Sequence, residues 1–199
     1  MKILIIGGNG TIGKVLTKKL SEKHELIIAG RNTGDIQVDI ANSNSIRKMF
    51  DQIGAVDAIV CAAGEAKWDY FDTLSEDDFY IGLKSKLMGQ IMLVKIGKEY
   101  LNKGGSITLT TGVLADDPVP MTTSAAMVNG AIHSFVKAAV LELEDIRLNV
   151  VSSGLVMDAA KKYEDYFPGH NPIPMPKVVN GYMKSVEGKI NGEIIRIYE

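Results

Sequence analysis

Three glycines near the start of the chain, Gly7, Gly10 and Gly13, have the spacing of a loop that holds a phosphate group. An apolar β-branched run, Ile3 to Ile6, precedes them, and helical periodicity follows from Lys14 to Leu20. Glycine here permits a tight turn, close approach of the backbone to a pyrophosphate, and packing of the helix on the strand, while the N–H groups of the helix N-terminus face the anion. An ordinary turn is the alternative. The predicted dinucleotide contacts are Gly7, Asn9, Gly10, Thr11, Ile12 and Gly13.

A cation follows the second predicted strand, which runs from Glu25 to Gly30. An acidic residue at this strand end binds the adenosine ribose hydroxyls, whereas a cation suits a 2′-phosphate. Arg31, with Asn32 beside it, therefore favours NADP(H) over NAD(H). The alternative is a solvated loop arginine, because arginines are mostly exposed.

The composition of the chain excludes several classes of protein. Its 199 residues suit one domain, residues 1–199. A net charge of -2 and a pI near 6.0 predict no nucleic-acid partner and no anionic membrane surface. One cysteine and three histidines predict neither a disulfide framework nor a metal site. With no signal peptide or membrane-spanning run recognised, we expect a cytoplasmic protein.

Strand and helix patterns alternate along the whole chain. This alternation predicts an α/β doubly wound Rossmann fold, a seven-stranded parallel sheet with helices on both faces and ligands beyond the strand C-termini. The predicted strands are 3–6, 25–30, 36–38, 56–60, 106–111, 147–152 and 193–198, and the predicted helices are 14–20, 44–51, 75–101, 121–143 and 178–186.

A proline-rich stretch at 158–176 interrupts this alternation. It holds Pro168, Pro172, Pro174 and Pro176 and lacks periodicity, so we predict a loop that serves as a substrate lid. The side chains that suggest an apolar, adaptable lid are Phe167, His170 and Met175.

These motifs together resemble the short-chain dehydrogenase/reductase family over nearly the whole chain. The glycine turn is similar to its cofactor turn, and Asp39 and Ile40 are similar to its adenine contact. Ser152 to Val156 resembles the Pro-Gly segment beside the nicotinamide, with Ser153 in place of proline. The segment that resembles the family's Asn-Asn-Ala-Gly motif is Cys61, Ala62, Ala63 and Gly64, and the contacts implied near the nicotinamide are Gly154, Leu155 and Val156.

The resemblance fails at the family's usual catalytic pair, a tyrosine with a lysine four residues later. Counting back from 141–143, which resembles the end of the same helix, places Ala125 and Asn129 at these positions. A methyl side chain cannot protonate a developing alkoxide. Tyr80 and Lys84 have the motif's spacing, but they precede the fifth strand, so we interpret them as an exposed helical pair.

Two other residues are candidates for the missing chemistry. Thr111 lies at or beside the family's serine position and could donate a hydrogen bond to a carbonyl oxygen, although a simple strand-end threonine is an equal alternative. Lys86 replaces the family's asparagine three residues before Gly89, and we hypothesise that its ammonium reaches the nicotinamide ribose or substrate. A solvated helical lysine is the alternative. Tyr163 and Tyr166 of the lid could also assist.

Two functions remain open from sequence alone. The first is an NADP(H)-dependent oxidoreductase that reduces a small carbonyl substrate or oxidises the alcohol, and the second is a non-catalytic NADP(H)-binding sensor or interaction protein. The resemblance also implies a homodimer or homotetramer through the two long helices. The small residues that would permit close helix approach are Ala125, Ala126, Gly130, Ala131 and Ser134.

Overall fold

A computed structural model describes all 199 residues, which fold around one seven-stranded sheet. The strand order is β3-β2-β1-β4-β5-β6-β7, and every neighbouring pair is parallel. The predicted doubly wound α/β fold is thereby confirmed. The strands are β1 (Lys2–Ile6), β2 (Glu25–Gly30), β3 (Ile36–Gln37), β4 (Val56–Cys61), β5 (Leu101–Gly112), β6 (Arg147–Ser153) and β7 (Ile194–Ile197).

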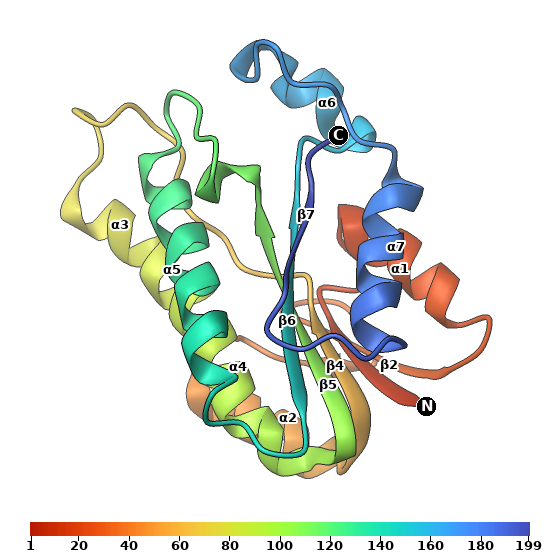
Figure 1. Ribbon diagram of the computed structural model, residues 1–199. Helices are drawn as coiled ribbons and strands as arrows, with labels where there is room; N and C mark the ends of the chain where they lie inside the picture. Colours follow the sequence, from red (N-terminus) through yellow and green to blue (C-terminus); the bar gives the residue numbers. More distant parts are fainter.

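Helices cover both faces of the sheet (Figure 1). On one face α1 (Thr11–Leu20) packs beside α7 (Met175–Val186), and on the other α2 (Ser43–Ile53) packs beside α4 (Gly89–Gly97), with α5 (Thr123–Ala139) completing the layer. No helix combines the length and apolar character needed to cross a bilayer.

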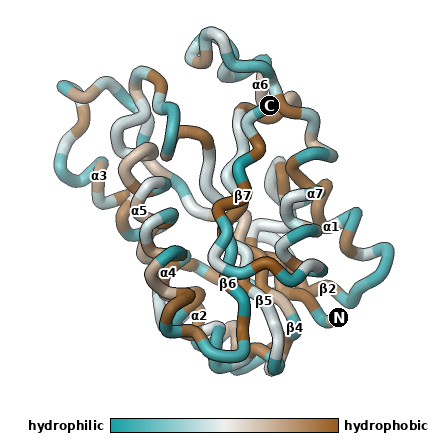
Figure 2. The backbone as a smooth tube through the Cα atoms, viewed as in Figure 1, coloured by the Kyte–Doolittle hydropathy of each residue, from teal (hydrophilic) through white to brown (hydrophobic).

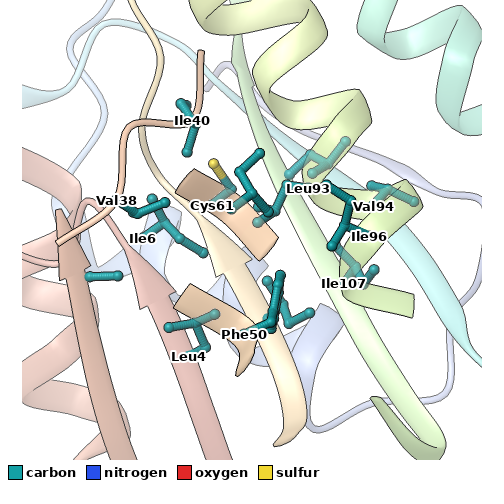
Figure 3. Packing of buried hydrophobic residues seen from close by; sticks show 14 of the residues in the cluster. Leu4, Ile6, Val38, Ile40, Phe50, Cys61, Leu93, Val94, Ile96 and Ile107 are labelled. Atoms are coloured by element: carbon teal, nitrogen blue, oxygen red, sulfur yellow. The ribbon is translucent and has the colours of Figure 1, made fainter. Parts of the chain in front are cut away.

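The strand period of two divides the core between these faces. Along β1, Leu4 and Ile6 belong to the cluster under α2 and α4, whereas Ile3 and Ile5 belong to the cluster under α1 and α7. Figure 3 shows the first cluster, in which Phe50 and other apolar side chains lie between strand and helix. In Figure 2 the central strands carry hydrophobic stretches, and α4 and α7 alternate between hydrophobic and hydrophilic residues. Burial on both faces explains why the strands are continuous apolar runs.

The predicted helix over 75–101 is confirmed as one unbroken helical run over residues 76–100, although the type of helix changes along it. It comprises α3 (Glu76–Gly82), a π-helical segment (Leu83–Met88), α4 and a 3-10 turn (Lys98–Tyr100). β5 then begins at Leu101, which pairs with Val56, while Ser106 pairs with Ala58. The residues between them bulge out of the ladder, with Gly104 at a φ of 78°. The Gly104-Gly105 pair is therefore an irregularity inside β5.

The predicted helix over 121–143 is also too long. Met121 has a φ of 70°, outside the helical region, and α5 begins two residues later at Thr123. Turn structure replaces the helix after Ala139. The remaining elements agree with their predictions to within a few residues.

The predicted loop over 158–176 is partly helical. α6 (Met157–Tyr163) and a 3-10 turn (Glu164–Tyr166) occupy its first half, because Asp158 to Tyr163 contains helix formers and the prolines start only at Pro168. A bridge between Val156 and Ile173 closes the base of the excursion. Met175, predicted to belong to the lid, is instead a buried core residue at the start of α7.

Candidate functional site

The glycine turn between β1 and α1 leaves no room for larger residues. Gly7 has a φ of 82°, and a Cβ atom there would lie 2.7 Å from the Ala62 carbonyl oxygen. At Gly13 a Cβ atom would lie 2.1 Å from the Gly7 carbonyl oxygen. Gly10 donates its N–H to the same Gly7 oxygen at 3.0 Å. The turn therefore holds the start of α1 directly against the end of β1.

The N-terminus of α1 has backbone N–H groups without hydrogen-bond partners. The first helical hydrogen bond runs from Lys14 N to Gly10 O at 2.9 Å, so the N–H groups of Thr11, Ile12 and Gly13 precede the helical ladder. No side chain caps this end, and no acidic residue lies in the first turn. These free donors suit a bound anion such as a pyrophosphate.

A first cavity of about 330 Å³ opens beside the turn, beyond the ends of β1, β2 and β4. The predicted contacts Arg31, Asn32, Ile40 and Ala63 line it. Asp39 does not, since its carboxylate instead accepts the N–H of Ala41 at 3.1 Å in a local turn.

An ion pair spans the rim of this first cavity. Arg31 donates to the Glu65 carboxylate at 3.0 Å, and both side chains are more than half exposed, at 55% and 57%. The hydrogen bond and charge of Glu65 raise the pKa of Arg31. Sequence reasoning missed Glu65, because it follows a different strand and no local pattern connects the two residues.

A second cavity of about 410 Å³ lies on the other side of Gly64, which lines both cavities. Its wall brings together Lys86, Thr111, Ala125 and Asn129. The sequence places these residues on three different elements, so only the fold makes them neighbours. The cofactor contacts predicted at this end, Ile12, Gly154, Leu155 and Val156, also line the cavity.

A buried glutamine holds the sheet open between the two cavities. The last ladder pair of β4 and β5 joins Val60 to Thr108. Beyond it Gln90, fully buried at the start of α4, accepts from Thr110 N at 3.2 Å and donates to Thr110 O at 3.0 Å. The side-chain amide thus satisfies backbone groups that lack a strand partner, and the strands diverge where a ligand would lie.

Lys86 lies in the π-helical segment, and its stem contacts Gly64. A Cβ atom at Gly64 would lie 3.0 Å from the Lys86 Cα atom and 3.1 Å from its Cγ atom. Lys86 is half-buried, and burial lowers the pKa of its ammonium. No carboxylate forms an ion pair with it. Such a cation can accept an uncharged hydroxyl or a negatively charged ligand atom.

Asn129 and Ala125 lie one turn apart on α5, at 4% exposure each. The Asn129 side-chain oxygen is buried without a hydrogen-bond partner. A buried orphan acceptor at a cavity wall is suited to a donor from a bound ligand. Ala125 contributes only a methyl group, so this wall has no hydroxyl at the position of the family's tyrosine.

The structure adds His133, which sequence reasoning missed. Its Nε2 atom lies 2.8 Å from the Thr111 hydroxyl, and both residues are buried. Burial lowers the pKa of His133, while the nearby charge of Asp116 partly opposes this. A signal was available: His133 follows Asn129 by four residues and therefore shares its helix face.

A charged network lies behind this pair. Asp116 accepts two hydrogen bonds from Arg196, at 2.9 and 3.0 Å, and a short one from the Tyr198 hydroxyl. Arg196 holds the pKa of Asp116 at about 2, and burial together with Asp116 raises the pKa of Tyr198 to about 12. Ser152 and Tyr198 share a hydrogen bond of 2.9 Å, so the network ties β6 to β7 at the site.

Aromatic side chains form the outer wall of the second cavity. Trp68 lies 5.4 Å from Tyr163 and 6.3 Å from Phe167 between ring centroids, and all three line the cavity. Tyr166 contacts Trp68 edge-on but does not line the cavity. Of the two lid tyrosines proposed from sequence, the structure therefore brings only Tyr163 to the site.

Two predicted cofactor contacts lie behind the cavity walls. Cys61 is fully buried in the core, its Sγ atom directed to the Ala63 carbonyl at 3.7 Å, and burial raises the pKa of its thiol to about 11. Ala62 approaches the turn through its backbone, and neither side chain lines either cavity. Only Ala63 and Gly64 of that motif face the space available to a ligand.

The two cavities together fit a dinucleotide. The free N-terminus of α1 lies at their junction, a cation lies at the far end of the first cavity, and an unpaired amide oxygen lies in the second. The order of strands reverses at β1 and β4, the position where open α/β sheets bind their ligands.

Comparison with known proteins gives concordant matches. The family model described as Enoyl-(Acyl carrier protein) reductase matches residues 12–172. The crystal structure of the protein lin1944 from Listeria innocua is 44% identical, with a TM-score of 0.98 over 100% of both chains. A small-chain dehydrogenase solved in complex with NADPH is 28% identical, with a TM-score of 0.88 over 99% of this chain and 96% of its own.

Curated proteins match over shorter stretches. The short-chain dehydrogenase/reductase ATR9 of Stachybotrys chlorohalonatus is 24% identical over 76% of this chain and 72% of its own length. The short-chain dehydrogenase/reductase ucsE of an Acremonium species is 30% identical over 59% of this chain and 43% of its own length.

Proposed function

Because this chain belongs to the short-chain dehydrogenase/reductase family, we propose that it binds NADP(H) and reduces a small carbonyl compound with residues other than the family's tyrosine and lysine. The observation that carries the proposal is the pair of cavities that meet at Gly64 beside the free N-terminus of α1. When bound, the cofactor supplies a hydride, and the protein orients the reactants and stabilises charge.

Each part of the cofactor has residues suited to it. The N–H groups of Thr11, Ile12 and Gly13 would hold the pyrophosphate. Arg31 would hold the 2′-phosphate after leaving Glu65, because a phosphate offers it a doubly charged partner. The NADPH complex of a 28% identical relative supports the same choice of cofactor.

The second cavity suits a substrate with a flat apolar body and no positive charge. Trp68, Tyr163 and Phe167 supply aromatic faces, and no carboxylate lines the wall. The Thr111 hydroxyl would hydrogen-bond the carbonyl oxygen, where negative charge develops during reduction. The substrate proposed is therefore an aromatic or otherwise planar aldehyde or ketone.

The cofactor is tested by calorimetry with NADPH and NADH. Arg31→Ala should weaken NADPH binding about 10-fold or more, since a hydrogen bond to a charged group contributes about 1.5–3 kcal/mol. NADH binding should change little. Arg47→Ala removes an exposed arginine from α2 that lines neither cavity, and it serves as the matched control. Equal losses for both cofactors would contradict the assignment of Arg31.

Lys86 is proposed to contact the nicotinamide ribose or the substrate. Lys86→Met keeps much of the stem that packs on Gly64 and removes the charge, so cofactor affinity or turnover should fall about 10-fold or more. Lys84→Met is the control, because Lys84 lies in the same segment but is exposed, 5.5 Å from the centre of the Tyr80 ring. Unchanged affinity and turnover in Lys86→Met would refute this role.

A non-catalytic NADP(H)-binding protein is the second candidate, favoured by the methyl group of Ala125 in the cavity wall. Following NADPH absorbance with a panel of aldehydes and ketones separates the two. NADPH binding without oxidation by any carbonyl would favour the sensor, and absence of binding would contradict both functions.

We also propose that the protein assembles as a homodimer or homotetramer in the cytoplasm. An apolar groove between α4 and α5, which includes Ile91, Val94 and Phe135, is available for a second copy. Light scattering after size-exclusion chromatography should give a multiple of the 21.6 kDa chain mass, and a monomer would contradict the assembly. The single cysteine, which can form no internal disulfide, is compatible with a reducing compartment.

A further inference from the structure

We propose that His133 and Thr111 form a proton relay that serves the second cavity in place of the family's tyrosine. The inference rests on the proposed reduction of a carbonyl compound. It assigns the proton, which the proposed function leaves without a source, to a residue that does not itself line the cavity.

The relay follows from the order in which the groups lie. Thr111, near the end of β5, lines the cavity, whereas His133 on α5 lies behind it. The Thr111 hydroxyl and His133 Nε2 are 2.8 Å apart. A substrate oxygen that binds the hydroxyl would therefore be one hydrogen bond away from a titratable imidazole.

Threonine needs this partner to act as a proton donor. A lone aliphatic hydroxyl does not ionise near neutral pH, so on its own it can only polarise a carbonyl. An imidazole behind the hydroxyl can replace the proton that the hydroxyl gives up, just as histidine takes the proton of an activated serine or threonine. Thr111 would touch the substrate, and His133 would act through it as a positioning and proton-holding residue.

The proton and electron movements balance. The carbonyl carbon gains the hydride from NADPH, the C=O π pair moves to oxygen, and that oxygen takes the hydroxyl proton of Thr111. Thr111 Oγ1 regains a proton from Nε2 of the His133 imidazolium. The products are the alcohol, NADP⁺ and a neutral imidazole, which water reprotonates before the next turnover. Alcohol oxidation runs the same transfers in reverse and needs the neutral imidazole.

Burial and the charged groups around His133 determine the pKa of its imidazole. Burial, Arg196 on β7 and Lys137 on α5 disfavour the imidazolium, whereas Asp116, in the loop before α5, favours it. The balance places the His133 pKa below 6.5. Because reduction needs the protonated form, its rate should rise as the pH falls through this pKa, while alcohol oxidation should rise with pH and level off above it.

A purely structural role for the hydrogen bond would tie α5 to β5 without moving a proton. Two variants distinguish the roles. Thr111→Val removes the hydroxyl and keeps the side-chain shape, and His133→Gln keeps an amide that can hydrogen-bond Thr111 but cannot titrate. His24→Gln is the control, since His24 lies outside both cavities and contacts Glu187.

The first readout needs no cofactor. NMR titration of the imidazoles in the unliganded protein, with the three histidines assigned through His→Gln variants, should show His133 titrating below 6.5, and Thr111→Val should shift its pKa and tautomer. The relay would be overturned if His133 remains neutral throughout the pH range of the folded protein, or if Thr111→Val changes neither its pKa nor its tautomer.

The second readout is turnover of 4-nitrobenzaldehyde with NADPH, a probe chosen for its flat aromatic ring. His133→Gln and Thr111→Val should each lower kcat about 100-fold, as expected for loss of acid–base catalysis, and remove the low-pH rise. The double variant should be no worse than either single one. Full activity in His133→Gln would overturn the relay alone.

Calorimetry with NADPH on every variant separates the relay from the proposed function. Unchanged NADPH affinity with a lost low-pH rise supports the relay. Absence of NADPH binding to the wild-type protein overturns the proposed function, while the imidazole titration still tests the coupling of His133 to Thr111.

Discussion

The two cavities are built on different principles, although they share Gly64. Beside the first, the glycine turn and the start of α1 offer backbone N–H groups, whose positions follow from the fold. In the second cavity the available groups are the side chains of Thr111, Lys86 and Asn129, and a single substitution can remove each of them. A fold can therefore keep its means of binding a dinucleotide while its catalytic groups change.

The two regions also differ in the space that they leave for a larger side chain. At Gly13 an added Cβ atom would lie 2.1 Å from a carbonyl oxygen, so the turn tolerates no other residue without shifting. Ala125 instead lines a cavity of about 410 Å³, although it also belongs to a small buried cluster with Leu155 and Phe167. A larger residue at Gly13 must displace backbone atoms, whereas a larger side chain at Ala125 can extend into the cavity.

The largest effect is expected at the turn. Gly13→Ala should displace the start of α1, weaken NADPH binding more than about 100-fold, and destabilise the fold by about 3 kcal/mol through overpacking. Gly130→Ala is the matched control, because a Cβ atom there meets nothing within 4 Å and alanine favours the helix by about 1 kcal/mol. Calorimetry and thermal unfolding measure both. Normal NADPH affinity in Gly13→Ala would show that the turn does not hold the cofactor.

The next largest effect, on the rate of reduction, is expected at the wall of the second cavity. The double change Ala125→Tyr and Asn129→Lys restores the family's pair within the existing cavity, and we expect reduction of 4-nitrobenzaldehyde to accelerate about 100-fold. The single Asn129→Lys change adds no proton donor beyond the Thr111–His133 pair and should give little gain. If the double variant folds and binds NADPH but is no faster, the second cavity does not position a carbonyl beside the cofactor.

A smaller effect is expected at the rim of the first cavity. Glu65→Gln frees Arg31 and removes a negative charge near the proposed 2′-phosphate, so NADPH should bind several-fold more tightly, by about 1 kcal/mol. Glu99→Gln, a change of an exposed glutamate that lines neither cavity, is the control. Tighter binding of NADH to the same degree would indicate that Glu65 does not discriminate through Arg31.

The smallest effect is expected on the stability of the folded protein in acid, through the ion pair of Asp116 and Arg196. Arg196 lowers the pKa of Asp116 from 3.8 to about 2, so the ion pair stabilises the folded state above pH 4 and this contribution is lost as the pH falls toward 2. The Asp116 side chain is 34% exposed, and solvent screening reduces the contribution to about 1 kcal/mol. Asp116→Asn should therefore lower urea stability at pH 7 but reduce its loss between pH 4 and 2. A parallel pH dependence in both proteins would contradict this.

The sequence by itself determined the layers of the fold and the cofactor turn. Alternation along β1 and the helical period of α1 are local patterns, and Gly7, Gly10 and Gly13 are demanded by backbone geometry within a few residues of one another. Predictions of this kind were confirmed for the sheet. They were wrong where proline content was taken for absence of helix, over α6, and where the helix predicted over 121–143 extended beyond both ends of α5.

Only the tertiary structure decided which side chains meet. Thr111 and His133 are 22 residues apart, and Arg31 and Glu65 are 34 apart, so no short-range period connects them. Each pair forms because parallel strands bring their C-terminal ends to one edge of the sheet, and because α5 packs beside β5 in a particular rotation. Packing of whole elements sets that rotation, and the local sequence does not encode it.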